Sequence, residues 1–409
     1  MSFINAGWSD VYLAAAGRGI SVCGDLLAAT TLALVLQEAG HGGLAVSGLF
    51  VAASLPIAVL APITGRLVDR ADSRTLMVVV GLAQTALCAA LAFATHPAVI
   101  IALVALLACG VAVTQPTIAA LVPGMVREAD LPRASGIVLT ASQVGMLAAP
   151  ALAGVLVGQT GARVPLLLAA AAYLGLSGIG LLIRTRRGVR TGPDSLPAVP
   201  FRLRDDRVLT VMTVAVAAVV AGVSAINVFE VFFIRDTLGA STTVYGFVMA
   251  SWTVGMLTAS LTFGRAARRW ITLRTVLALL TGTCVVVLAG AGVQGAGWLI
   301  PLWILGGAAN GALNICTTVL IAGRVRPAAH GRAFAATTAV VQGAGLTGLL
   351  VAGPLAESFE PRALVAGAGA AGVLAALACL PLVRSEPPAT PVRESAGSDV
   401  TGIEPARWG

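Results

Sequence analysis

Two carboxylates and an arginine lie in long apolar stretches of the sequence, where charged side chains are costly. Asp25 lies about midway along the apolar stretch 11–37, and Arg18 precedes it by seven residues on the same helical face. Glu230 lies at the end of a second such stretch. A carboxylate at the centre of a membrane helix costs about 2.5–3.5 kcal/mol on insertion scales, so it usually faces a cavity or a partner. Asp25 is therefore the first candidate for proton coupling, with Glu230 as the second and Arg18 as the charge that tunes Asp25.

Each of these groups also has a purely structural explanation. Asp25 and Arg18 can pair with each other, and Glu230 can reach the outer interface beside Arg235. Amide side chains occur in the same kind of stretch, where they can contact a substrate or form hydrogen bonds between helices. These amides belong to Gln115, Asn227, Asn310 and Asn314.

The composition excludes several other kinds of chemistry. All 26 basic residues are Arg, so a phosphate-binding or Schiff-base lysine is absent. The six cysteines show no CxxC spacing and the three histidines lie far apart, so we expect no metal site. Glycine-rich GxGxxG matches follow no strand of a βαβ unit, as a dinucleotide site would require. We therefore expect neither an enzyme nor a bound cofactor.

The elements that hold these residues are apolar segments long enough to cross a membrane. Hydrophobic residues make up 57% of the 409 residues and charged residues only 11%, which is too few to cover a soluble surface. Uncharged stretches of about 20 residues or more recur along the chain, and two of them, 75–126 and 275–323, hold two spans each. The sequence predicts twelve transmembrane helices, six before residue 184 and six after residue 207.

The distribution of Arg predicts the orientation. With the N-terminus in the cytoplasm, 22 Arg lie in inner segments and only Arg163, Arg235 and Arg362 in outer loops. Both termini are then cytoplasmic, in a plasma or inner membrane. Because the positive charge is spread over every inner loop, the formal net charge of +8 does not indicate a nucleic-acid partner.

The two halves of the chain repeat the same pattern. Arg127 and Arg133 after the fourth segment recur as Arg326 and Arg332 after the tenth, 199 residues later. An even number of helices in each half gives both halves the same orientation. We expect a six-helix bundle over 1–183, a linker over 184–206, a second bundle over 207–383 and a disordered tail over 384–409.

The loop expected after the second span resembles the signature loop of the major facilitator superfamily. It reads Gly65-Arg-Leu-Val-Asp69-Arg70-Ala-Asp72-Ser-Arg74, with Asp72 and the following Ser departing from the usual Gly and Arg. The resemblance implies a fold of two pseudo-symmetric six-helix bundles. It also implies that Gly65, Asp69, Arg70 and Arg74 form a conformational latch, in which the carboxylate caps a helix end across the bundle interface and pairs with Arg.

A second motif resembles the antiporter motif of the same superfamily. The segment Gly145-Met-Leu-Ala-Ala149-Pro150-Ala-Leu-Ala153-Gly154 has Ala at two positions where the motif has Gly. Small residues at this spacing allow close helix packing, and Pro bends the helix. The start of the chain also resembles drug:proton antiporters of the macrolide-efflux and siderophore-exporter group. In this superfamily helices 1, 4, 7 and 10 line the cavity, and the resemblance places the polar residues named above around one substrate.

These observations together predict a secondary transporter that exports a small amphipathic molecule by proton antiport. No inner loop is large enough for a nucleotide-binding domain, whereas a proton gradient supplies about 2.3 kcal/mol per charge per 100 mV. The expected partners are a small-molecule substrate, protons and the lipid bilayer, with a monomer as the working unit. Two alternatives stay open: proton-coupled solute uptake by symport, and a membrane receptor or assembly factor that keeps the fold without transport.

Overall fold

The computed structural model describes residues 3–185, 203–263, 271–325 and 329–379, which form α-helices and no strand. Twelve of these helices are long and apolar enough to cross a membrane, as the sequence predicts. They are α1 (Phe3–Glu38), α2 (Gly43–Arg70), α3 (Ser73–Leu91), α4 (Pro97–Met125), α5 (Leu131–Thr160), α6 (Arg163–Leu182), α7 (Arg207–Phe232), α8 (Thr242–Phe263), α9 (Leu273–Ala291), α10 (Leu299–Arg324), α11 (His330–Ser358) and α12 (Pro361–Ala378).

Short elements connect some of these helices. A π-helical turn, η3 (Phe233–Thr237), extends α7, and single 3-10 turns form η1 (Glu128–Asp130), η2 (Leu203–Asp205) and η5 (Ala296–Trp298). Residues 186–202, which make up most of the expected linker, and residues 380–409, which include the expected tail, lie outside the described part of the chain.

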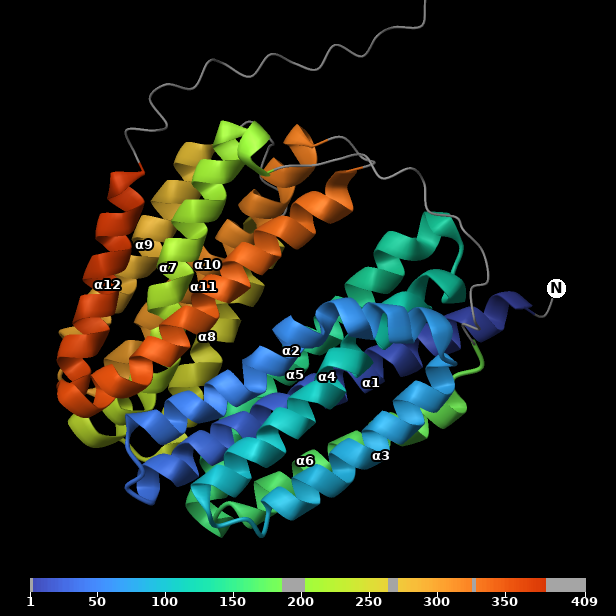
Figure 1. The fold of residues 1–409 in the computed structure, drawn as a ribbon, viewed down its shortest axis with the longest axis horizontal. Coiled ribbons are helices and arrows are strands. Elements are labelled where there is room, and N and C mark those ends of the chain that lie inside the picture. The colour runs from blue at the N-terminus through green and yellow to red at the C-terminus, as the bar shows by residue number, and fades with distance from the viewer. Residues whose placement is uncertain (1–2, 186–202, 264–270, 326–328, 380–409) are drawn as a thin grey trace, which may run out of the picture.

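The helices pack as two bundles with the same internal arrangement (Figure 1). In the first bundle α1 packs on α5, α2 on α4 and α3 on α6. In the second bundle the same pairs recur six helices later, as α7 on α11, α8 on α10 and α9 on α12. This is the parallel repeat that the Arg pattern predicts, and it gives the two-bundle, all-α membrane fold.

The repeat extends to single residues at the bundle interface. Gly154 of α5 packs against Gly246 at the start of α8, and a Cβ at position 154 would lie 2.9 Å from the Gly246 Cα. Its counterpart 199 residues later, Gly353 of α11, packs against Ser47 of α2, where a Cβ would lie 3.0 Å from the Ser47 Cβ. Helices α5 and α8 on one side, and α2 and α11 on the other, therefore hold the bundles together.

The connection between α2 and α3 differs from the expected loop. Helix α2 continues through Arg70, so Gly65, Asp69 and Arg70 belong to its last turns, and only two residues separate it from α3. Asp72, which departs from the family pattern, accepts a hydrogen bond from the Thr75 amide (3.1 Å) and caps α3. Thr272 caps α9 in the same way 200 residues later, with a bond of 3.2 Å.

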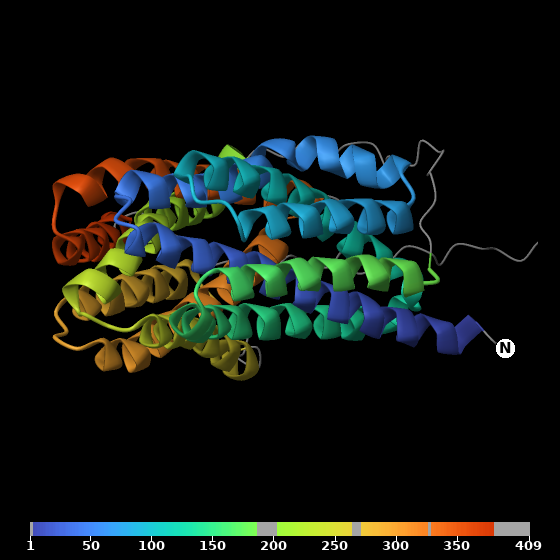
Figure 2. The same cartoon turned by 90° about the horizontal axis from the view of Figure 1, so that it is seen from below.

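The two bundles meet at one end and diverge at the other (Figure 1; seen from below in Figure 2). We call the end at which α1 begins and α12 ends the terminal face, and the other the closed face. Hydrogen bonds between pairs of described residues link the bundles only towards the closed face, for example from Ser47 Oγ to the Leu349 carbonyl (2.5 Å). The bundles therefore contact each other at the closed face and diverge towards the terminal face (Figure 1).

Candidate substrate and proton site

A cavity of about 490 Å³ lies in the wall of the first bundle, between α1, α2, α4 and α5, with Met256 of α8 at its edge. Most of its lining is apolar. Its polar groups come from α1, α4 and α5, and they are Arg18, Asp25, Gln115, Ser142 and Gln143. Three of the residues expected from the sequence, Arg18, Asp25 and Gln115, thus face one space.

The partner of Asp25 is a tyrosine and not Arg18. The hydroxyl of Tyr173, on α6, donates a hydrogen bond to Asp25 Oδ1, and Tyr173 itself is fully buried. Arg18 and Asp25 form no ion pair within the part of the chain that the structure describes. The Arg18 Nη1 atom is buried without a hydrogen-bond partner there, and so is the hydroxyl of Ser21 between the two charges. Arg18 can therefore influence Asp25 only through its electrostatic field and not through a direct contact.

A second cavity of about 320 Å³ lies between the bundles and contains Glu230. The Glu230 side chain is only 4% exposed, and its Oε1 accepts a hydrogen bond from the indole Nε1 of Trp303, on α10. Asn227 and Asn310 line the same cavity. Asn314 is not among the lining residues, and its amide instead donates to Asn310 Oδ1 (3.1 Å).

The two cavities adjoin each other. Leu26 and Ala29 of α1 and Met146 of α5 line both of them. The surroundings of Asp25 and those of Glu230 therefore share a wall, and the second cavity lies nearer the closed face, where α7 ends.

Aromatic residues of the second cavity were not singled out from the sequence. They are Phe50, Tyr245, Trp252 and Trp303, which come from α2, α8 and α10. In an apolar sequence an aromatic residue gives no signal of its own, because it packs equally well in a core or against lipid. These rings line one cavity with Glu230 only because α2, α8 and α10 pack with the corresponding faces turned towards each other.

The closed face carries a polar contact between the bundles that the sequence analysis also missed. Arg235, in the η3 turn, forms an ion pair with Glu38 at the end of α1 (2.8 Å) and donates to Gln37 Oε1 (3.3 Å). Gln37 in turn donates to Asp236 Oδ1 (2.7 Å). Arg235 therefore pairs with the other bundle, and Glu230 turns into the cavity instead of reaching Arg235.

The small residues of α5 serve two different contacts. Gly145 packs against the backbone of Gly19 and Cys23 on α1, inside the first bundle. Gly154 packs against α8, across the bundle interface, and the Pro150 carbonyl lies against Gly246 of the same helix. Ala149 and Ala153 are completely buried between these positions. Close packing of α5 thus supports both the bundle and its contact with the other one.

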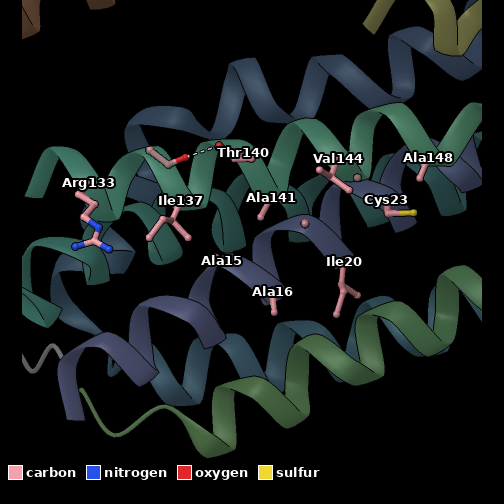
Figure 3. A pocket seen from close by; sticks show the side chains of 13 residues that line it. Ala15, Ala16, Ile20, Cys23, Arg133, Ile137, Thr140, Ala141, Val144 and Ala148 are labelled. Atoms are coloured by element: carbon pink, nitrogen blue, oxygen red, sulfur yellow. Dashed lines mark hydrogen bonds between the residues drawn. The ribbon is translucent and has the colours of Figure 1, made fainter. Parts of the chain in front are cut away.

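A further cavity lies on the other side of the α1–α5 contact and is a different kind of space. This groove of about 740 Å³ is lined by α1 and α5 alone (Figure 3). Arg133 lies at one end of the labelled row of side chains, and the remaining lining is small or apolar, apart from Thr140. The groove contains no carboxylate, so the candidate site is the pair of adjoining cavities.

The expected latch rests on residues for which the structure describes little. For Gly65, Asp69 and Arg70 only the helical backbone is described. Arg74 lies in the first turn of α3 and is half-buried.

Within the described residues, no three His, Cys, Asp or Glu side chains gather as metal ligands.

The family model of the Major Facilitator Superfamily matches the chain twice, over residues 14–229 and 212–408. The chain therefore belongs to this superfamily of transporters, and it is a multi-pass membrane protein and not an enzyme. No curated protein sequence matches it.

Solved structures of transporters share the fold at low sequence identity. A variant of the nucleoside transporter NupG aligns with a TM-score of 0.75 at 14% identity, covering 91% of this chain and 99% of that chain. A bacterial homologue of the iron transporter ferroportin, in an inward-facing state, aligns with a TM-score of 0.72 at 14% identity, covering 91% and 98%. A bacterial homologue of the human lysosomal transporter Spinster, also inward-facing, aligns with a TM-score of 0.71 at 13% identity, covering 93% and 96%.

Proposed function

We propose that this protein exports a small amphipathic molecule across the plasma or inner membrane by proton antiport. The observation that carries the proposal is Asp25, a carboxylate in the wall of a transporter cavity, bonded to Tyr173 and not paired with Arg18. A carboxylate held by one neutral donor can exchange its proton with a cavity, whereas one locked in an ion pair resists protonation.

The excess of Arg assigns the terminal face to the cytoplasm. The structure is then open to the cytoplasm and closed towards the outside by Arg235, Glu38 and the α2–α11 and α5–α8 contacts. An exporter loads its substrate in this conformation. Rocking of the bundles about the central cavities would then close the cytoplasmic end and open the other one.

The coupling follows from the charge of the cavity wall. Proton uptake by Asp25 from outside would neutralise the carboxylate and weaken its hold on a polar or cationic substrate, so the substrate leaves. The bundles then return with Asp25 protonated, and the proton leaves to the cytoplasm. Because a proton on Asp25 weakens the binding of the substrate in the adjoining cavities, this scheme is antiport. The α5 segment from Gly145 to Gly154, similar to the antiporter motif, supports the same direction.

The proposal is tested by comparing cells with and without the protein. We expect expression to lower the accumulation of at least one lipophilic dye from a panel, and a protonophore to abolish the effect. The control is the chain with Asp25→Asn at matched membrane abundance, which should give no efflux. Increased accumulation driven by the proton gradient would indicate symport. No gradient-dependent change for any dye or exported metabolite would favour a receptor or assembly factor.

A further inference from the structure

We infer that the cavity around Glu230 binds a monovalent organic cation with a flat apolar body. This inference names the substrate class of the proposed transporter. Only the statement that the bound cation is transported rests on the proposed function. The binding site itself stands on Glu230 and on the rings around it.

Glu230 is a carboxyl group without a cationic partner among the described residues that line its cavity. It is almost fully buried in a membrane-spanning bundle, and it accepts a hydrogen bond from the neutral indole of Trp303. No Arg or His is among the residues that line its cavity, and Tyr245 is the one other titratable side chain among them. The closest Arg in sequence, Arg235, is bound to Glu38 and to the Ala240 carbonyl (2.6 Å).

This contrasts with the neighbouring cavity, where Asp25 has Arg18 beside it in the wall. Leaving a buried carboxylate ionised and uncompensated is costly, so Glu230 binds either a proton or a cation. Without an adjacent cavity, a buried carboxylate can bind only a proton. A cavity beside the carboxylate also gives an organic cation room to bind. Glu230 opens onto about 320 Å³, which is within the size range of ligand pockets.

The rest of the lining specifies the body of the cation. Phe50, Tyr245, Trp252 and Trp303 surround the space, and aromatic faces attract organic cations that have shed their water. Met146 and Met249 add adaptable apolar surface. A hydrated metal ion would find few oxygen ligands here, whereas a flat aromatic cation finds a counter-charge and rings. The amides of Asn227 and Asn310 can form hydrogen bonds with one further polar group of the ligand.

The cavity combines both halves of the molecule. Phe50 and Met146 belong to the first bundle, and Glu230, Trp252 and Trp303 belong to the second. Rocking of one bundle against the other would therefore take Phe50 and Met146 away from the carboxylate. The affinity for the cation then differs between the two conformations, as transport requires.

Equilibrium binding of radiolabelled N-methyl-phenylpyridinium to the purified chain in lipid nanodiscs tests the inference. The wild type should bind it, and neutral phenylpyridine should compete poorly. Glu230→Gln should weaken binding by about tenfold or more, because the counter-charge is lost, while Glu230→Asp should retain most of it. Trp252→Ala should weaken binding several-fold. The matched control is Glu360→Gln, at an exposed position that precedes α12, which should bind like the wild type.

The pH dependence gives a second readout. Lowering the pH protonates Glu230, so cation binding to the wild type should weaken as the pH falls, while the residual binding of Glu230→Gln should not change. The inference is wrong if the wild type does not bind the probe, if neutral phenylpyridine binds equally well, or if folded Glu230→Gln keeps wild-type affinity. Asp25→Asn should weaken cation binding much less than Glu230→Gln does, because Asp25 lines the adjoining cavity and not this one. A failure of proton coupling at Asp25 and a failure of this site therefore give different results.

Discussion

At the scale of single residues, the two intramembrane carboxylates share one arrangement. Asp25 accepts a hydrogen bond from Tyr173, and Glu230 accepts one from Trp303, so each is held by the polar tip of an aromatic side chain from another helix. Such a donor fixes the carboxylate without neutralising it, and the aromatic body shields it from lipid. We assign proton coupling to the first and cation binding to the second.

Tyr173→Phe tests the first assignment. The substitution keeps the buried ring and removes only the hydroxyl, so it should cost about 1 kcal/mol of stability. Without that donor the Asp25 carboxylate is less stabilised, and the pH at which transport is half-maximal should shift upward. Transport measured over a series of pH values checks this, together with thermal unfolding. Tyr12→Phe, at an exposed position of α1, is the matched control and should leave the profile unchanged. If the pH profile of Tyr173→Phe equals that of the wild type, Tyr173 has no role in proton coupling.

The sequence locates these carboxylates but not their partners. Asp25 stands out because it interrupts an apolar stretch, and the cost of a buried charge makes that signal strong. Tyr173 lies 148 residues away and reaches Asp25 only because α6 packs on α1. The spacing of seven residues places Arg18 on the same helical face as Asp25, but sharing a face does not bring the two side chains within hydrogen-bonding distance.

At the scale of helices, α5 connects the interior of its own bundle with the other bundle. Its Gly154 allows α8 to approach closely at the closed face, and the same contact recurs as Gly353 against α2. The small-residue motif could be found in the sequence, but its division into an α1 contact and an α8 contact could not. That division depends on which side of α5 each residue occupies in the packed bundle.

Gly154→Val should prevent the bundles from meeting at the closed face. A Cβ there would already lie 2.9 Å from the Gly246 Cα, and backbone at that distance cannot give way cheaply. We expect transport to be lost, and a cysteine introduced at Thr30 in the cavity to react more readily with an impermeant maleimide added from the closed face. Gly175→Val, in α6 where a Cβ would have no neighbour within 4 Å, is the control. Unchanged labelling would show that this contact does not set the conformation.

The connection between α2 and α3 offers a sharp comparison of two neighbouring carboxylates. Asp69→Asn should slow transport severely while insertion and folding stay intact, because the resemblance assigns a latch to its charge. Asp72→Asn should have little effect, since Asp72 caps α3 through a hydrogen bond that Asn also accepts. Transport rates at matched membrane abundance check both. Equal rates in the wild type and Asp69→Asn would make this segment a simple connector.

At the scale of the whole molecule, the two bundles are joined by few polar contacts. The ion pair between Arg235 and Glu38 is partly exposed, with 20% and 42% of the side chains accessible, and such pairs contribute about 0.2–1 kcal/mol. Even at the upper end this ion pair favours the conformation that is closed at this face by only about fivefold. The α2–α11 and α5–α8 packing therefore contributes the main part of the contact between the bundles.

Uphill transport by the wild type and Asp25→Asn, reconstituted in proteoliposomes, tests the central claim most directly. A substrate identified by the dye assay is supplied at equal concentration on both sides, and the interior is made acidic. Proton antiport by the wild type predicts accumulation of the substrate in the acidic interior. Asp25→Asn should show none, yet it should still exchange labelled for unlabelled substrate without a gradient. Accumulation by Asp25→Asn at the wild-type rate would contradict the account, and so would wild-type movement of substrate towards the alkaline side.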